Sequence, residues 1–285
     1  MRVFDPHVHM SSRTTTDYRA MRDAGVRALV EPAFWAGQPR TSVGSFVDYF
    51  AALIGWEPFR ASRYGIRHHC TIALNPKEAN DPRCVPVLDV LPRYLEKDNV
   101  VGVGEIGYDS MTAEEDEAFS AQLALAIEHG LPALVHTPHR DKAAGTVRSI
   151  AVIRESGLSP ERVVLDHLNE VTVRAAKDSG CWLGFSIYPD TKMDETRMVA
   201  ILREYGTEKM LVNSAADWGE SEPLTTVRTG AAMLAAGFGI HDVDKVLWRN
   251  PVEFYQQSGR LDMSEADTAD TEYGGNSVLR GERKG

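Results

Sequence analysis

Two histidines separated by one residue, His7 and His9, lie at the end of the first apolar run, Val3–His7. Side chains alternate between the two faces of a strand, so residues two apart point the same way. We therefore expect both imidazoles to emerge together at the carboxyl end of this strand. Imidazole is a common ligand of zinc, manganese, iron and nickel. The pair alone is weak evidence, because a strand-end histidine is commonly a hydrogen-bonded structural residue.

Further side chains of metal-binding type follow other predicted strands at the same end. They are Glu105, His136, His167 and, several residues beyond the last strand, Asp217. With the first pair they make four imidazoles and two carboxylates. Buried carboxylates without partners are costly, and divalent cations would offset that cost. The set therefore predicts a metal site. For Asp217 alone, the alternative is that its side chain caps the loop.

Two metal ions would use the whole set, with Glu105 as the bridging carboxylate. The two N-terminal histidines and Asp217 would hold one ion, and His136 with His167 the other. Such a pair lowers the pKa of a bound water toward neutrality. Asp217 would accept the proton of that water, so Glu105 and Asp217 are the predicted catalytic residues. Zinc is the first expectation for the metal, with manganese, nickel and iron as alternatives.

The elements that must position these residues alternate between strand and helix. The predicted strands are Val3–His7, Ala28–Glu31, His69–Leu74, Val100–Glu105, Ala133–His136, Val163–Asp166, Cys181–Ser186 and Met210–Asn213. They are short and nearly all apolar, as in a parallel sheet buried on both faces. The predicted helices are Thr15–Asp23, Ser45–Phe59, Pro82–Lys97, Ala113–His129, Thr146–Ser156, Val171–Ser179, Asp194–Tyr205 and Leu224–Ala236.

Eight such pairs predict an α/β protein that folds as a (β/α)8 TIM barrel. An open doubly wound sheet is the competing architecture, but polar residues follow nearly every strand instead of gathering at one crevice. We expect one barrel domain over residues 1–262, with an extra helix at Val243–Ser258 and a polar C-terminal tail over 263–285. The loops Pro32–Val43 and Pro189–Asp194 should border the active face.

The amino-acid composition limits which binding partners and which cellular compartment are expected. The net charge of −10 over 285 residues disfavours a long polyanion such as nucleic acid. Three scattered cysteines argue for a reducing compartment. With no apolar run of membrane-spanning length and no secretory signal, the expectation is a cytoplasmic protein without membrane contact. The sequence leaves a monomer and a homo-oligomer equally open.

The motifs resemble those of the amidohydrolase superfamily, and within it the TatD-like metal-dependent hydrolases. The resemblance rests on Phe4-Asp5-Pro6-His7-Val8-His9 and Gly104-Glu105-Ile106-Gly107-Tyr108-Asp109, completed by His136, His167 and Asp217, and covers residues 1–258. The second of these segments separates the chain from relatives whose metals are bridged by a carboxylated lysine. TatD-like proteins are typically two-metal phosphodiesterases, several of them nucleases, while the superfamily also hydrolyses amides, lactones and phosphotriesters.

The chain departs from the usual TatD pattern in three places. Asn75 stands before a proline where the family usually has histidine; it can hydrogen-bond a substrate but carries no charge. Ala215 stands where the family commonly has glutamate. An aromatic pair, Phe34-Trp35, enters the loop after the second strand. The resemblance therefore implies the metal centre more directly than it implies DNase activity.

Several residues are candidates for substrate contact. Pro138 fixes the turn after the fifth strand, so His139 and Arg140 should project toward the metals, with an Arg140–Asp141 pair as the alternative. Arginine offers a planar fork for phosphate or carboxylate. Asn75 and four aromatic residues also lie beside strand ends. These aromatic residues are Trp35, Tyr108, Tyr188 and Trp218.

The predicted function is metal-dependent hydrolysis of a small phosphoester or related small molecule. Hydrolysis of an amide, cyclic amide or lactone is the second expectation, and a DNase of TatD type the third. A metal-dependent binding or scaffold module without turnover is the non-enzymatic alternative. His68 and His69 point to opposite faces of the third strand. They are expected to be hydrogen-bonded core residues, with entry of one of them into the barrel mouth as the alternative.

Overall fold

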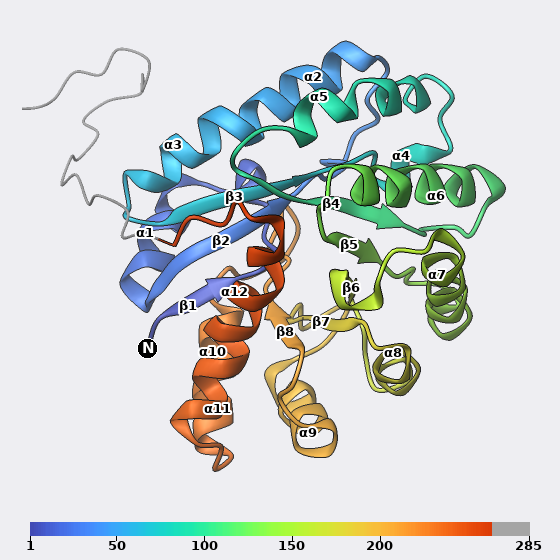
Figure 1. Cartoon of the computed structure of the whole chain (residues 1–285). Coiled ribbons are helices and arrows are strands. Elements are labelled where there is room, and N and C mark those ends of the chain that lie inside the picture. The colour runs from blue at the N-terminus through green and yellow to red at the C-terminus, as the bar shows by residue number, and fades with distance from the viewer. Residues whose placement is uncertain (264–285) are drawn as a thin grey trace, which may run out of the picture.

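The computed structural model describes residues 1–263, which fold around one sheet of eight parallel strands in sequential order (Figure 1). The predicted polar tail, 263–285, lies outside the described residues except for Met263. The strands are β1 (Val3–Asp5), β2 (Val26–Pro32), β3 (Arg67–Ile72), β4 (Val100–Gly107), β5 (Ala133–His136), β6 (Val163–Asp166), β7 (Trp182–Ser186) and β8 (Met210–Asn213).

Hydrogen bonds just beyond β1 and β8 bring the two edges of this sheet together. The amide of Ala215 donates to the carbonyl of His7, and the amide of His9 donates to the carbonyl of Ala216, both at 2.9 Å. These contacts make the sheet a nearly closed barrel, as a (β/α)8 fold requires. The barrel prediction is thereby confirmed over the open doubly wound sheet.

Helices follow the strands and cover the outside of the barrel (Figure 1). They are α1 (Thr15–Ala24), α2 (Val43–Ala51), α3 (Glu57–Ser62), α4 (Pro76–Ala79), α5 (Leu91–Leu95), α6 (Ala113–Glu128), α7 (Lys142–Ser156), α8 (Val173–Ser179), α9 (Glu195–Tyr205), α10 (Thr225–Ala235), α11 (Ile240–Asp244) and α12 (Asn250–Tyr255). Short 3₁₀ turns occur at Met10–Ser12, Val85–Asp89, Pro160–Arg162 and Gln256–Ser258, and π-helical turns at Ala52–Trp56 and Lys245–Arg249. No described helix is both long and apolar enough to cross a membrane.

One helix prediction was wrong. The range Pro82–Lys97 is not a single helix but a 3₁₀ turn at Val85–Asp89 followed by α5. Pro86 and Pro92 each lack an amide hydrogen and clash with the preceding turn, so a continuous helix cannot pass through both. Each proline instead lies in the first turn of its own short helix.

The C-terminal segment closes the amino-terminal end of the barrel. Its aromatic rings, Phe254 and Tyr255 of α12, join the interior side chains of the strands in one buried cluster. Tyr255 stacks on Phe4 of β1 with ring centroids 6.1 Å apart, and Phe254 packs on Trp182 of β7 at 5.6 Å. The expected extra helix is therefore present. It leaves the carboxyl end of the barrel as the open one.

Candidate metal centre and its pocket

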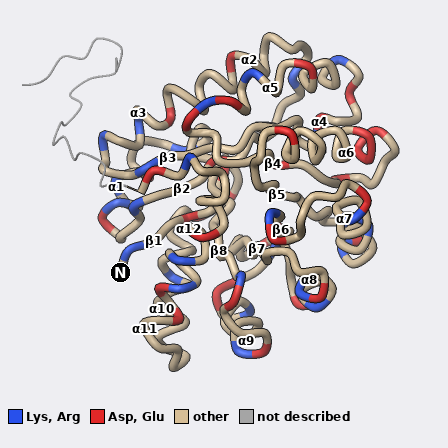
Figure 2. Tube along the Cα trace, in the orientation of Figure 1, with Lys and Arg blue, Asp and Glu red and all other residues tan. Residues whose placement is uncertain are grey.

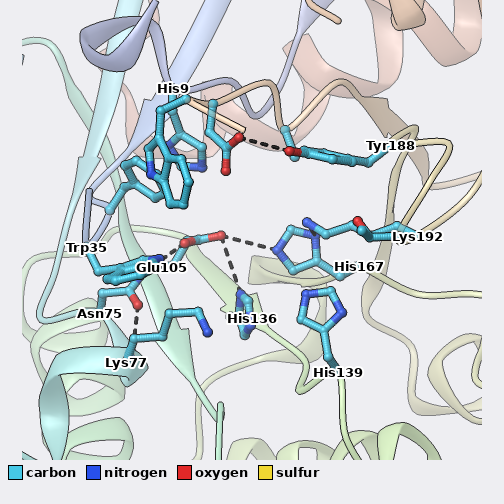
Figure 3. Close-up of a pocket in the computed structure, with 15 residues that line it drawn as sticks. His9, Trp35, Asn75, Lys77, Glu105, His136, His139, His167, Tyr188 and Lys192 are labelled. Carbon is cyan, nitrogen blue, oxygen red and sulfur yellow. Dashed lines mark hydrogen bonds and ion pairs between the residues drawn. The ribbon is translucent and has the colours of Figure 1, made fainter. Parts of the chain in front are cut away.

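Five of the six predicted ligands converge at the carboxyl ends of the strands. Oε1 of Glu105 lies 3.2 Å from His7 Nε2, 3.3 Å from His167 Nε2 and 3.6 Å from His136 Nδ1. His9 Nε2 lies 3.0 Å from His7 Nε2. Figure 3 shows Glu105 in the middle of the pocket with His136 and His167 facing it. All five side chains are buried. One carboxylate oxygen thus stands at the centre of several imidazole nitrogens.

Local backbone irregularities aim two of these ligands. The register between β4 and β5 shifts between Gly104 and Ile106, so Glu105 occupies a bulge, a feature that redirects a side chain from the regular pleat. His167 follows the last residue of β6 with a φ of 61°, in the left-handed region. Its amide donates to Oδ1 of Asp166 at 2.7 Å, which holds this turn in place.

Several buried imidazole nitrogens lack a hydrogen-bond partner among the described residues. Both ring nitrogens of His136 and Nδ1 of His9 belong to this group. Buried polar atoms normally have partners, so such a concentration requires an explanation. A cation that accepts nitrogen lone pairs would supply one, and the donor set of imidazoles and carboxylate suits a transition metal.

The surrounding charges favour the protonation states that metal ligands need. Burial opposes ionisation of Glu105, but the charge of His7 and the neighbouring imidazoles of His136 and His167 outweigh it and hold its pKa well below the usual range. Burial, followed by the charge of His7, lowers the pKa of His9. Burial and then Lys192 lower the pKa of His167. The ionised carboxylate and the neutral imidazoles of His9 and His167 are the forms that bind metals. For His7, burial lowers the pKa, but Glu105 and Asp166 outweigh burial and raise it.

Asp166 is a residue of the site that was not predicted. Its Oδ2 lies 2.5 Å from Nδ1 of His7, and Asn213 donates to its Oδ1 at 3.0 Å. A carboxylate that accepts from one ring nitrogen directs the other nitrogen toward a metal. Burial raises the pKa of Asp166, but His167 and the hydrogen bond from His7 outweigh this and lower it overall. Its position at a strand end, directly before His167, was the available signal.

Asp217 lines the same pocket but stands apart from the three clusters of candidate ligand atoms there. Its Oδ1 accepts hydrogen bonds from the amide of Gly219 at 2.8 Å and from the hydroxyl of Tyr188 at 3.1 Å. The contact with Gly219 is the loop-capping role considered as the alternative. The metal-ligand role of Asp217 stays a prediction.

A cavity of about 190 Å³ opens above the cluster. Of the predicted substrate residues, it is lined by Trp35, Asn75, His139, Tyr188 and Trp218. Phe34, the partner of Trp35 in the predicted aromatic pair, also lines the cavity, and the lining residues that the sequence analysis missed are Lys77, Thr191 and Lys192. The predicted border loops supply Phe34, Thr191 and Lys192, so their location was foreseeable although their roles were not. Lys77 follows Asn75-Pro76 and had no comparable signal.

Two predicted substrate residues lie elsewhere. Tyr108 is only 1% exposed, packs against Phe119, and its hydroxyl hydrogen-bonds Asp116. Gly107, with a φ of 120°, turns the chain before it, and the tyrosine lies in the outer core instead of the pocket. Arg140 is exposed and outside the pocket lining, because the chain faces the pocket at His139 and then turns into α7.

A second buried group with ligand-type side chains lies away from the pocket. It comprises Glu31, Glu57 and His68. His68 Nε2 is 2.8 Å from Glu31, and Glu57 is paired with Arg60 at 2.9 Å. Both carboxylates of this group therefore have partners within the protein. His69 instead bonds the carbonyl of Asp262 at 3.1 Å, and both histidines are core residues as expected.

Solved structures share this fold. A TatD-like protein from Archaeoglobus fulgidus superposes with a TM-score of 0.74 at 22% identity, covering 89% of this chain and 99% of that one. A phosphotriesterase homology protein from Escherichia coli, complexed with phosphate in its active site, gives 0.66 at 16%, covering 90% and 99%. A lactonase from Listeria monocytogenes gives 0.62 at 15%, covering 89% and 94%.

Sequence comparison points to one family. An uncharacterised metal-dependent hydrolase of Methanocaldococcus jannaschii is 24% identical over 255 residues, which cover 89% of this chain and all of that protein. The family model described as TatD related DNase matches residues 4–256. The match spans the whole barrel and contains every residue of the histidine–carboxylate cluster. The chain therefore belongs to the TatD family of metal-dependent hydrolases.

Proposed function

We propose that this protein is a two-metal hydrolase that cleaves a small phosphoester. The observation that carries the proposal is the position of Glu105 Oε1, within 3.6 Å of nitrogens from three histidines of three different strand ends. A carboxylate so placed is suited to bridge two ions. The other oxygen, Oε2, accepts from Asn75 Nδ2 at 2.8 Å, which fixes the carboxylate plane.

The proposed ligands divide into two sets. His7, His9 and Asp217 would hold one ion, His136 and His167 the other, with the bridging carboxylate shared. When bound, such ions lower the pKa of a coordinated water and polarise the bond under attack. Zinc is the proposed metal, and manganese, nickel and iron suit the same donors.

Proton transfer falls to Asp217 in this proposal. Its Oδ1 is occupied by Tyr188 and Gly219, whereas Oδ2 makes no hydrogen bond to the described residues. Oδ2 is therefore the atom that would take a proton and return it to the leaving group. Tyr188, which also lines the pocket, keeps the carboxylate of Asp217 oriented toward it.

Three observations support a small substrate over a nucleic acid. The cavity of about 190 Å³ is below the usual range for ligand pockets, roughly 300–1,000 Å³. The chain carries a net charge of −10. Figure 2 shows acidic and basic residues interspersed over the outer helices, in contrast to a continuous basic stripe. The phosphate bound by the E. coli structural neighbour supports a phosphoester, and the Listeria lactonase keeps amide and lactone substrates as the second candidate.

The compartment and assembly state are also part of the proposal. All three cysteines are buried and unpaired, which supports a reducing, cytoplasmic environment. A homo-oligomer is compatible with the site, since every proposed ligand comes from one chain.

Elemental analysis of protein purified without added metal or chelator tests the centre. We expect close to two transition-metal equivalents per chain, and almost none in a His7→Ala/His167→Ala double variant. A panel of aryl phosphoesters, lactones, amides and a single-stranded oligonucleotide then tests the bond. Turnover of aryl phosphoesters above all others supports the proposal. Less than half an equivalent of metal after reconstitution, or a preference for the oligonucleotide, contradicts it.

A further inference from the structure

One side of the pocket contains a lysine that the proposed hydrolysis does not use. Lys77 lies in the short helix α4, whose N-cap is Asn75. The side chain of Asn75 also donates to Glu105. Lys77 is therefore only two residues along the chain from a direct contact with the candidate metal centre. Figure 3 shows Trp35, Asn75 and Lys77 on one side of Glu105, with His167 and Lys192 on the other. The two lysines therefore face different parts of any bound molecule.

The Lys77 ammonium group retains binding capacity. Its Nζ donates to Oδ1 of Asp109 at 2.6 Å and lies 5.6 Å from the ring centroid of Trp35. The side chain is 31% exposed. An ammonium group has three donors, and Asp109 accepts only one of them. Two donors are left for an anion lying on the tryptophan side of the pocket.

An aromatic wall adjoins this lysine. Trp35 meets Trp218 edge to face, with centroids 6.1 Å apart and planes at 76°. Trp218 lies beneath Gly37: a Cβ there would come within 3.0 Å of the indole, and the φ of 83° also favours glycine. The two indoles thus connect the loops after β2 and β8. Trp218 nevertheless stays 56% exposed at the pocket mouth.

The charge of the pocket complements an anion. Its lining contains two lysines, Lys77 and Lys192, and two carboxylates, Glu105 and Asp217. These four charges cancel, and Asp109, which pairs with Lys77, adds one negative charge beside the lining. The two divalent ions of the proposed function would make the site positive overall. Such a site in a chain with net charge −10 concentrates anionic ligands locally.

We propose that Trp35, Trp218 and Lys77 form a subsite for the part of the substrate that is not cleaved, and that this part is a planar apolar group bearing an anionic substituent. This inference rests on the proposed function, because it places the cleaved bond at the Glu105 centre. The planar group lies against the indoles, and its acidic substituent accepts hydrogen bonds from Lys77. Indole faces favour planar partners, which they bind by offset stacking.

Binding of three non-hydrolysable phosphonates to the metal-loaded protein tests this subsite. Methylphosphonate probes the metal centre alone, benzylphosphonate adds the ring, and 4-carboxybenzylphosphonate adds the anion. Isothermal titration calorimetry should show at least a tenfold gain in affinity at each addition. Lys77→Met should abolish the gain from the carboxylate only, and Lys77→Arg should retain it. Trp35→Leu and Trp218→Leu should each reduce the gain from the ring.

Arg140→Gln is the matched control, since this cation lies near the same pocket but outside its lining. It should change none of the three affinities. Metal content measured for every variant separates loss of the centre from loss of the subsite. Equal affinities for the three phosphonates, or equal weakening of all three by Lys77→Met, would overturn the subsite while leaving the hydrolase proposal intact. Absence of methylphosphonate binding would instead count against the proposed function and, with it, against this inference.

Discussion

At the scale of single residues, the site depends on one buried carboxylate. Glu105 accepts from Asn75 and lies within ion-pair distance of His7, His136 and His167. It shares clusters of candidate ligand atoms with all four histidines of the centre. A change at this position should therefore affect the whole centre and not one half of it.

Glu105→Gln is expected to remove most bound metal, because a neutral amide cannot bridge two cations. Elemental analysis should find well under one equivalent per chain, against about two in the wild type. Asp217→Asn is the informative comparison: it should keep most of the metal and lose turnover at least a hundredfold. Wild-type metal stoichiometry in the Glu105 variant would show that this residue is not the bridge.

Asp166 should act on metal affinity through His7. Replacing it with asparagine weakens the acceptor for His7 Nδ1, and loss of such an outer partner typically costs about 10- to 100-fold in metal affinity or activity. Competition with a chromophoric chelator measures the change. Asp190→Asn, at an exposed position in the loop after β7, should leave the affinity at its wild-type value. The role fails if both variants bind metal alike.

At the scale of elements, Arg13 connects the loop after β1 to the loop after β8, and Arg60 connects the loop after β1 to α3. Arg13 donates to the carbonyl of Asp217 at 3.0 Å. Arg60 of α3 donates to the carbonyls of Met10 and Arg13, and its guanidinium pairs with buried Glu57. A helix on the outside of the barrel thus supports the loop that carries the proposed proton acceptor.

Arg13→Gln is accordingly expected to lower kcat about tenfold with a smaller change in KM, because Asp217 loses its backbone support while the pocket walls persist. Metal content should stay at the wild-type value. Steady-state kinetics on the best substrate of the panel measure the split, and Arg13→Lys should recover part of kcat. An unchanged kcat in the glutamine variant would show that the loops hold Asp217 without this contact.

At the scale of the whole molecule, the two ends of the barrel have different tasks. The carboxyl end carries the site, and α12 closes the amino end with Phe254 and Tyr255. His69 lies near that closed end, 4% exposed, and bonds Asp262. Burial lowers its pKa from 6.5 to about 4. This histidine links folding stability to pH independently of the metal centre.

Through His69, the folded protein should lose stability as the pH falls. Between pH 6.5 and pH 4 the unfolded chain protonates His69 and the folded chain does not, so acidification favours unfolding. The loss reaches about 3 kcal/mol at pH 4, taking roughly 1.4 kcal/mol per pH unit. Urea unfolding at pH 7 and pH 5 should show a smaller pH-dependent loss in His69→Gln than in the wild type. Identical losses in the two proteins would rule out this contribution.

Much of the architecture follows from local sequence patterns. Alternation of short apolar runs with helical stretches predicted the eight-stranded barrel, and the bounds of β5, β6 and β8 agree with the prediction residue for residue. Strand-end positions of five candidate ligands were predictable for the same reason, since parallel strands deliver their carboxyl ends to one face. The sequence alone thus determined the fold and the meeting place of the chemistry.

Only the tertiary structure decided which side chains face the pocket. The bulge at Glu105 and the support of His7 by Asp166 depend on backbone conformation and on contacts between distant segments. The same holds for the pocket lining, which includes Lys77 and leaves out Arg140. Tyr108 shows the same limit, because Gly107 turns the chain and buries the ring. Strand periodicity is a local property that sequence patterns carry, whereas the direction of a loop side chain is set by packing partners far away in the chain.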